Sequence, residues 1–182
     1  MTATAKPETG ATAVANGIET NYLEDGSGDE TVLLIHGLIH GSGPGVTSYA
    51  NWRLVMPALA TKFRVIAPDM VGFGFSERPE NVDYRVQTWA DQVIGLMDAL
   101  GIEKTSLVGN SFGGALALRI AIQHPERIDK LVLMGSMGVT FPITEGLERV
   151  SGFEASFENM RKVLDVFAYS RELVNDELAQ VR

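Results

Sequence analysis

Residues 105–123 read TSLVGNSFGGALALRIAIQ, an apolar run that becomes glycine- and alanine-rich at a serine. Residues 105–109 predict a buried strand and residues 112–123 predict a helix. Between them, Gly109-Asn110-Ser111-Phe112-Gly113 matches G-x-S-x-G, in which a nucleophilic serine occupies a sharp turn between a strand and a helix. Such a turn tolerates only very small neighbours, and the flanking glycines meet that requirement. We therefore predict that Ser111 is a nucleophile; the alternative is a serine that only caps the helix.

The rest of the chain repeats this alternation of strand and helix. Apolar runs predict strands at 32–35, 63–67 and 130–134, with a weaker one at 20–23. Helical spacing of apolar residues predicts helices at 51–62 and 86–100. Strands that alternate with helices imply βαβ units with right-handed crossovers. We predict an α/β protein with a mostly parallel sheet and flanking helices.

Composition limits the functions that are open to the chain. It has 182 residues, a net charge of -8 and no cysteine. An acidic chain lacks the basic surface of a nucleic-acid binder, and without cysteine there is no disulfide, thiolate metal site or cysteine nucleophile. No apolar run is long enough to span a membrane. The expected partner is a small molecule, and composition is also compatible with a homo-oligomer.

The chain is expected to contain three segments. Residues 1–16 have almost no large apolar side chains and no signal-peptide pattern, so we predict a flexible tail on a cytoplasmic protein. Residues 17–137 contain the alternating strands and helices and form the predicted core. Residues 138–182 contain no further strand pattern and read as the start of a helical lid.

A second glycine-rich loop, His40-Gly41-Ser42-Gly43-Pro44-Gly45, follows the predicted strand 32–35. A loop in this position supplies a backbone N–H to an oxyanion hole, and the N–H of Phe112 would supply another. The alternative is an ordinary glycine-rich turn. The loop is preceded by a tandem repeat, Leu-Ile-His-Gly at 34–37 and again at 38–41. The extra four residues either loop out and leave Ser42 in place, which we favour, or displace the loop from Ser111.

Other candidate sites are weaker. His36 and His40 lie four residues apart, but glycines surround them and no HExxH pattern is present, which argues against a metal site. His124 precedes a proline at a predicted helix end and is expected to interact with the helix dipole. The run Gly72-Phe73-Gly74-Phe75-Ser76 lacks the third glycine of a nucleotide loop and is interpreted as a second active-site loop.

Together these motifs resemble the α/β-hydrolase fold and, within it, the meta-cleavage product hydrolases, particularly the 2-hydroxymuconate-semialdehyde hydrolases of aromatic degradation. The motifs that carry the resemblance are residues 40–45, 50–53, 68–74, 109–114, 158–161 and 176–178. It implies ketonisation of a dienol ring-fission product, followed by hydrolysis of a carbon–carbon bond. Serine chemistry with a backbone oxyanion hole needs neither a cofactor nor a metal, so we expect none. The site residues that the resemblance implies are Ser111 as nucleophile, Ser42 and Phe112 as oxyanion-hole donors, and Gly41, Asn51, Asn110 and Arg182 as substrate contacts.

The chain departs from this family in its histidines. The catalytic order in this fold is Ser, then Asp or Glu, then His, but no histidine follows His124. We therefore expect this chain to be the N-terminal part of such an enzyme, without the acid, the base and the later strands, and with little activity by itself. Without the later strands, residues 130–134 are expected to form an exposed sheet edge. The alternatives are a carboxylesterase of the same fold and a non-catalytic binding protein.

Overall fold

A computed structural model describes residues 9–38, 46–151, 154, 156–176 and 179. The described residues divide into two compact units, one ending at Gly138 and the other beginning at Val139. The expectations that concern residues 1–8, the loop 40–45 with His40, Gly41 and Ser42, and Arg182 lie outside the described residues.

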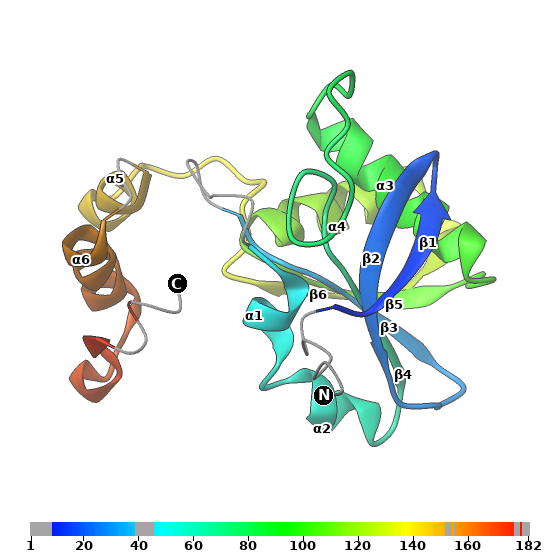
Figure 1. Ribbon diagram of the computed structural model, residues 1–182, viewed down its shortest axis with the longest axis horizontal. Helices are drawn as coiled ribbons and strands as arrows, with labels where there is room; N and C mark the ends of the chain where they lie inside the picture. Colours follow the sequence, from blue (N-terminus) through cyan, green and yellow to red (C-terminus); the bar gives the residue numbers. More distant parts are fainter. Residues whose placement is uncertain (1–8, 39–45, 152–153, 155, 177–178, 180–182) are drawn as a thin grey trace, which may run out of the picture. The chain divides into compact units, whose positions relative to one another are not determined.

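The first unit is built on a six-stranded sheet in the order β1-β2-β4-β3-β5-β6 (Figure 1). β4, β3, β5 and β6 run parallel to one another, whereas β2 is antiparallel to both β1 and β4. The predicted α/β class with a mostly parallel sheet is confirmed. The strands are β1 (Ala11–Ala15), β2 (Ile18–Asp25), β3 (Thr31–Ile35), β4 (Arg64–Pro68), β5 (Thr105–Asn110) and β6 (Ile128–Met134).

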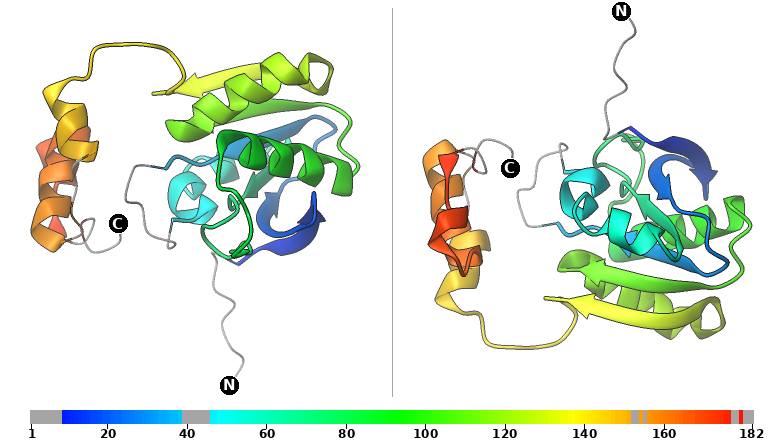
Figure 2. Two further views of the ribbon diagram at one scale, coloured as in Figure 1. Left: turned by 90° about the horizontal axis from the view of Figure 1, so that it is seen from above. Right: turned by 90° about the horizontal axis from the view of Figure 1, so that it is seen from below.

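Helices cover both faces of this sheet, as the two views of Figure 2 also show. Successive residues of a strand point to opposite faces. Accordingly, Leu33 and Ile35 join the core under α3 and α4, whereas Val32 and Leu34 join the core under α1 and α2. The helices are α1 (Ser48–Trp52), α2 (Met56–Ala60), α3 (Val86–Ala99) and α4 (Phe112–Gln123), and the short 3-10 helix η1 (Pro125–Arg127) follows α4.

The predicted flexible tail is wrong for residues 11–15, which form β1. This strand pairs with β2 through a two-residue turn at Asn16 and Gly17, both of which have positive φ. An Asn-Gly pair is the strongest short signal for such a hairpin. The strand itself was missed because its side chains are small, although Ala15 is fully buried.

The predicted helix at 51–62 is two short helices, α1 and α2, separated by a turn at residues 53–55. Pro57 lies in the first turn of α2. Proline has no N–H to donate to the preceding turn, and its ring disfavours helical backbone at the residue before it. A single continuous helix is therefore interrupted at this point.

β6 forms one edge of the sheet, where its neighbour among the described strands is β5. Its side chains are largely exposed, including the apolar Val132, Leu133 and Met134. The exposed edge expected at residues 130–134 is thus present in the described part of the chain.

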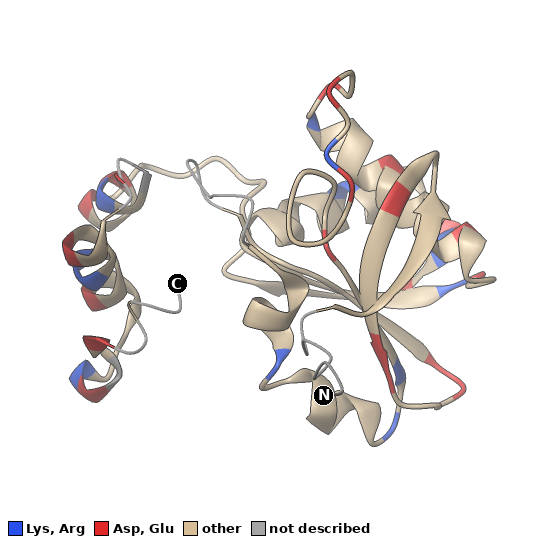
Figure 3. Cartoon of the chain, viewed as in Figure 1, with Lys and Arg blue, Asp and Glu red and all other residues tan. Residues whose placement is uncertain are grey.

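The second unit contains α5 (Glu145–Ser151), α6 (Phe157–Phe167) and the 3-10 helix η2 (Arg171–Leu173). The Ser156 side chain caps α6 by accepting a hydrogen bond from the Asn159 N–H. Both helices carry closely spaced charges of both signs (Figure 3). Val150 of α5 and Val163 and Leu164 of α6 are buried. No helix in the described residues of either unit is long and apolar enough to cross a membrane.

Candidate active site

Ser111 lies on a strained turn between β5 and α4. Its φ is 53° and its ψ is -117°, and Asn16 is the other non-glycine residue with positive φ in the described chain. Strain of this kind is concentrated at functional sites. The Ser111 side chain makes no capping hydrogen bond to α4. The geometry therefore does not support the alternative of a simple helix cap, and it matches the turn expected for a nucleophilic serine.

Glycines make this turn sterically possible. A β-carbon at Gly109 would lie 2.4 Å from the carbonyl oxygen of Gly113, and one at Gly113 would lie 2.3 Å from the carbonyl oxygen of Ile35. Because these obstacles are backbone atoms, no side-chain rearrangement could relieve them. The helix start thus packs directly against the ends of β3 and β5.

Backbone hydrogen bonds hold the turn. The Ser111 N–H donates to the Met134 carbonyl at 2.9 Å, and the Ser111 carbonyl accepts from the Gly114 N–H at 3.0 Å and the Met137 N–H at 3.1 Å. The Phe112 N–H makes no hydrogen bond to another described residue. This amide lies at the N-terminus of α4, where the helix leaves N–H groups without internal partners, so it is available to a ligand.

Asn51 and Asn110 both contact the backbone at Gly37, immediately after β3. The Asn51 Oδ1 accepts a hydrogen bond of 3.2 Å from the Gly37 N–H. A β-carbon at Gly37 would lie 2.6 Å from Asn110 Oδ1 and 3.2 Å from the β-carbon of Ser111. The structure thus brings two predicted substrate contacts together beside Ser111, and it shows that one of them also holds the loop after β3.

His36 is fully buried behind this loop. Its Nε2 accepts a hydrogen bond of 3.0 Å from the Met70 N–H, and its Nδ1 lies 3.2 Å from the Gly37 carbonyl oxygen. Burial lowers the pKa of His36, although the Gly37 carbonyl and the Asp69 carboxylate partly oppose that effect. The ring is therefore neutral, with its proton on Nδ1. Both nitrogens are engaged within the protein, so His36 is neither a metal ligand nor a base for Ser111.

Asp69 was not singled out from the sequence, yet its carboxylate joins β2, the start of α1 and the loop after β4. Its Oδ1 accepts from the Ser48 N–H at 2.6 Å, and its Oδ2 accepts from Asn21 Nδ2 and the Phe75 N–H, each at 2.9 Å. A β-carbon at Gly74 would lie 2.2 Å from this carboxylate. The glycine-rich run at 72–76 therefore folds around a buried anion and not around a ligand phosphate.

The remaining histidine in the described residues, His124, lies at the opposite end of α4 from Ser111. A helix of 12 residues separates them, which corresponds to about 18 Å. Its Nδ1 is 3.7 Å from Glu126 Oε1. No group of His, Asp or Glu suited to a metal occurs in the described residues. Within that part of the chain, Ser111 has no histidine base.

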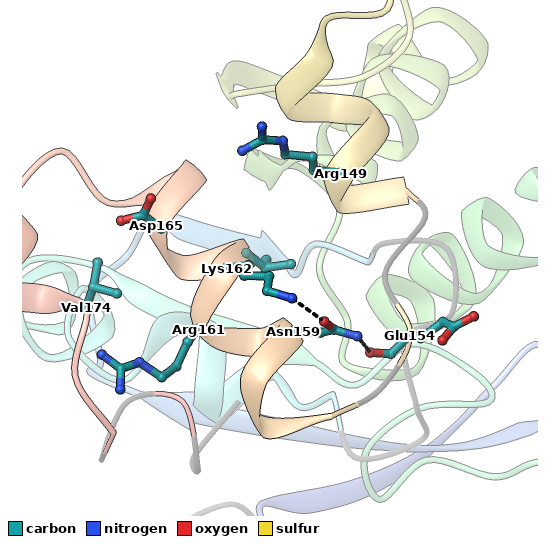
Figure 4. A pocket seen from close by; sticks show the side chains of 8 residues that line it. Arg149, Glu154, Asn159, Arg161, Lys162, Asp165 and Val174 are labelled. Atoms are coloured by element: carbon teal, nitrogen blue, oxygen red, sulfur yellow. Dashed lines mark hydrogen bonds between the residues drawn. The ribbon is translucent and has the colours of Figure 1, made fainter.

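The second unit has a hollow of about 580 Å³ (Figure 4). Its polar lining is largely paired: Lys162 Nζ donates to Asn159 Oδ1, and Asn159 Nδ2 donates to the Glu154 carbonyl. The arginines Arg149 and Arg161 form ion pairs with Glu145 and Asp176. The hollow is lined by Arg149, Glu154, Asn159, Arg161, Lys162, Val163, Asp165 and Val174.

Comparison with known proteins agrees with this geometry. The sequence model of the family described as "alpha/beta hydrolase fold" matches residues 30–171. The chain belongs to the α/β hydrolase fold family.

Several relatives carry more specific names. A 2-hydroxymuconate semialdehyde hydrolase of Pseudomonas sp. strain CF600 is 58% identical over 176 residues, which cover 97% of this chain and 60% of that protein. A 2-hydroxy-6-oxo-2,4-heptadienoate hydrolase of Pseudomonas putida F1 is 55% identical over 96% of this chain and 62% of that protein. This chain therefore spans about 60% of the length of these relatives.

A solved structure supports the same relationship. The meta-cleavage product hydrolase CumD from Pseudomonas fluorescens IP01, solved as a serine-to-alanine mutant complexed with acetates, superposes with a TM-score of 0.88. It is 55% identical, and the match covers 97% of this chain and 63% of that one. The predicted resemblance to meta-cleavage product hydrolases is thus confirmed at the level of sequence and fold.

Proposed function

We propose that this chain carries the nucleophile of a hydrolase that cleaves a carbon–carbon bond in a ring-fission product of aromatic degradation, a dienol of the 2-hydroxymuconate semialdehyde type. The observation that carries the proposal is the strained turn at Ser111, set in a chain 58% identical to a 2-hydroxymuconate semialdehyde hydrolase. The substrate is a small molecule. The cytoplasmic location of the protein, its homo-oligomeric state and the role of residues 138–182 as a lid stay predictions.

The chemistry follows from the position of Ser111. Ketonisation of the dienol leaves a carbonyl carbon bonded to a carbon that can depart as a conjugated enolate. Ser111 Oγ adds to the carbonyl carbon and loses its proton to a base, and the resulting oxyanion accepts a hydrogen bond from the Phe112 N–H. The carbon–carbon bond then breaks, the departing enolate takes up a proton, and water hydrolyses the acyl-serine. Neither a metal nor a cofactor takes part.

The base is the group that the described residues do not supply. His36 is buried and doubly hydrogen-bonded, and His124 lies at the far end of α4. We propose that full turnover needs a histidine and an acid that the described residues do not provide. Loss of the base in a serine hydrolase lowers kcat by about 10⁶. The 182-residue chain by itself is therefore expected to turn over substrate very slowly.

A chimera tests this function. Residues 1–182 are joined to the C-terminal part of the CF600 relative that the alignment does not cover, and loss of the dienol absorbance is followed with the chimera, its Ser111→Ala variant and the 182-residue chain. We expect turnover by the chimera alone, with a loss of about 10⁶ in the variant. A folded chimera that hydrolyses only simple esters would instead identify a carboxylesterase. Binding of the dienol without turnover would identify a non-catalytic binding protein.

A further inference from the structure

The repeated Leu-Ile-His-Gly raises the question of which copy lies beside Ser111. The first copy, residues 34–37, and the following Leu38 are described. β3 ends at Ile35, which pairs in register with Gly109 of β5, and His36 and Gly37 follow at once. Only one His-Gly pair can directly follow β3, and in this structure it is His36 and Gly37 of the first copy.

Two hydrogen bonds hold the first copy in place. The buried His36 ring accepts from the Met70 N–H, and the Asn51 side chain accepts from the Gly37 N–H. Gly37 lies close to Ser111, since a β-carbon at Gly37 would lie 3.2 Å from the β-carbon of Ser111. The His-Gly step of the first copy thus occupies the position beside the nucleophile.

The amides of this loop are not equally available. The Gly37 N–H is taken by Asn51. The next amide, that of Leu38, has no acceptor among the described residues, which is also true of the Phe112 N–H on the other side of the elbow. An oxyanion hole requires two backbone N–H groups beside the nucleophilic serine, and the Leu38 and Phe112 amides, which have no acceptor among the described residues, are suited to these positions.

We propose that the backbone N–H of Leu38 is the second oxyanion-hole donor, opposite Phe112, in the place that the family resemblance gives to Ser42. Ser42 follows Leu38 by four residues, which corresponds to up to about 14 Å of extended chain. The duplication therefore replaces a hydroxyl-bearing residue at the oxyanion hole with an aliphatic one. This assignment rests on the proposed role of Ser111 as the nucleophile.

Amide resonances test the assignment without turnover. The ¹⁵N-labelled 182-residue chain is titrated with sodium benzoate, whose carboxylate mimics an oxyanion, against sodium chloride at equal ionic strength. We expect the Leu38 and Phe112 resonances to shift together with one dissociation constant. Joint shifts of Phe112 and Ser42 with Leu38 unmoved would overturn the assignment. So would a titration in which none of the three amides moves.

A pair of substitutions separates the amide from its side chain. Leu38→Pro removes the N–H, whereas Leu38→Ala keeps it and shortens the side chain. In the active chimera, Leu38→Pro is expected to lower kcat by about 10²–10³, the usual cost of one lost donor, and Leu38→Ala to be far more active than Leu38→Pro. Equal activity of the two variants would contradict the proposal, and their melting temperatures show whether both are folded.

The two proposals can fail separately. If the chimera hydrolyses no ring-fission product while Leu38 and Phe112 both respond to benzoate, the proposed function is wrong and the donor assignment stands. If the chimera is active but Ser42 is the amide that responds with Phe112, the donor assignment alone is wrong.

Discussion

His36 Nε2 accepts a hydrogen bond of 3.0 Å from the backbone N–H of Met70, which joins the residue after β3 to the second residue after β4. The ring nitrogen is an acceptor only while the imidazole is neutral. Burial lowers the pKa of His36 and so keeps it in that form. The loop beside Ser111 is therefore held by a group whose protonation would break the contact.

We expect stability to depend on the protonation of His36. Because its pKa is lowered in the folded state, the unfolded chain binds the extra proton first, and stability falls as the pH drops below the unfolded value of about 6.5. His36→Gln keeps an acceptor but does not titrate. The difference in unfolding free energy between wild type and this variant, measured by urea denaturation, is expected to shrink between about pH 8 and about pH 5.

A control separates this effect from other titrating groups. His124→Gln removes a histidine at the end of α4 that has no role in the loop after β3. If both variants change the pH dependence equally, the contribution cannot be assigned to His36.

His36→Ala leaves the Met70 N–H without its acceptor. It is expected to lower the unfolding free energy by about 2 kcal/mol at neutral pH.

Asp69 is expected to be the most sensitive carboxylate in the sheet unit. It accepts three hydrogen bonds, from Ser48, Asn21 and Phe75, and is almost fully buried. Asp69→Asn replaces one acceptor oxygen with a donor and leaves a buried N–H facing it. We expect a loss of about 3 kcal/mol in unfolding free energy by urea denaturation.

Asp29→Asn is the matched control for Asp69→Asn, because Asp29 is exposed. Surface substitutions of this kind change stability by about 0.5 kcal/mol or less. A comparable loss in the two variants would show that the Asp69 contacts contribute little.

The Asp69 contacts could not be predicted from this sequence, whereas the turn at Ser111 could. The elbow at Ser111 was predictable because a strand, a turn and a helix lie within one short stretch and each needs a recognisable residue type. The buried network was not, since Asp69 bonds to Asn21, which is 48 residues away in sequence. Hydrogen bonds between distant segments leave no local periodicity. β1 was missed for a related reason, because its small residues become buried only by pairing with β2.

The exposed edge of β6 predicts self-association of the 182-residue chain. Val132 is 50% exposed and Leu133 41% exposed on a strand that has a neighbour on one side among the described strands. Unpaired apolar edges of this kind recruit other strands, and lysine on an edge prevents it. We expect Val132→Lys to shift the chain toward monomer in light scattering at high protein concentration.

Leu54→Lys is the control for the edge, since Leu54 is 83% exposed in the turn between α1 and α2 and lies outside the sheet. It adds the same charge and removes an exposed aliphatic side chain. If Leu54→Lys reduces association as much as Val132→Lys, net charge and not the edge governs the behaviour.

The strain at Ser111 predicts that the nucleophile is held at a cost in stability. Glycine adopts the φ of 53° found here at little cost because it has no β-carbon, whereas the β-carbon of serine clashes with the backbone. We expect Ser111→Gly to raise the unfolding free energy by about 1 kcal/mol while removing the nucleophile. Asn16→Gly is the comparison, because Asn16 has a φ of 49° in a hairpin turn where asparagine is already favoured. A gain at Asn16 that equals or exceeds the gain at Ser111 would contradict the idea that strain is concentrated at the nucleophile.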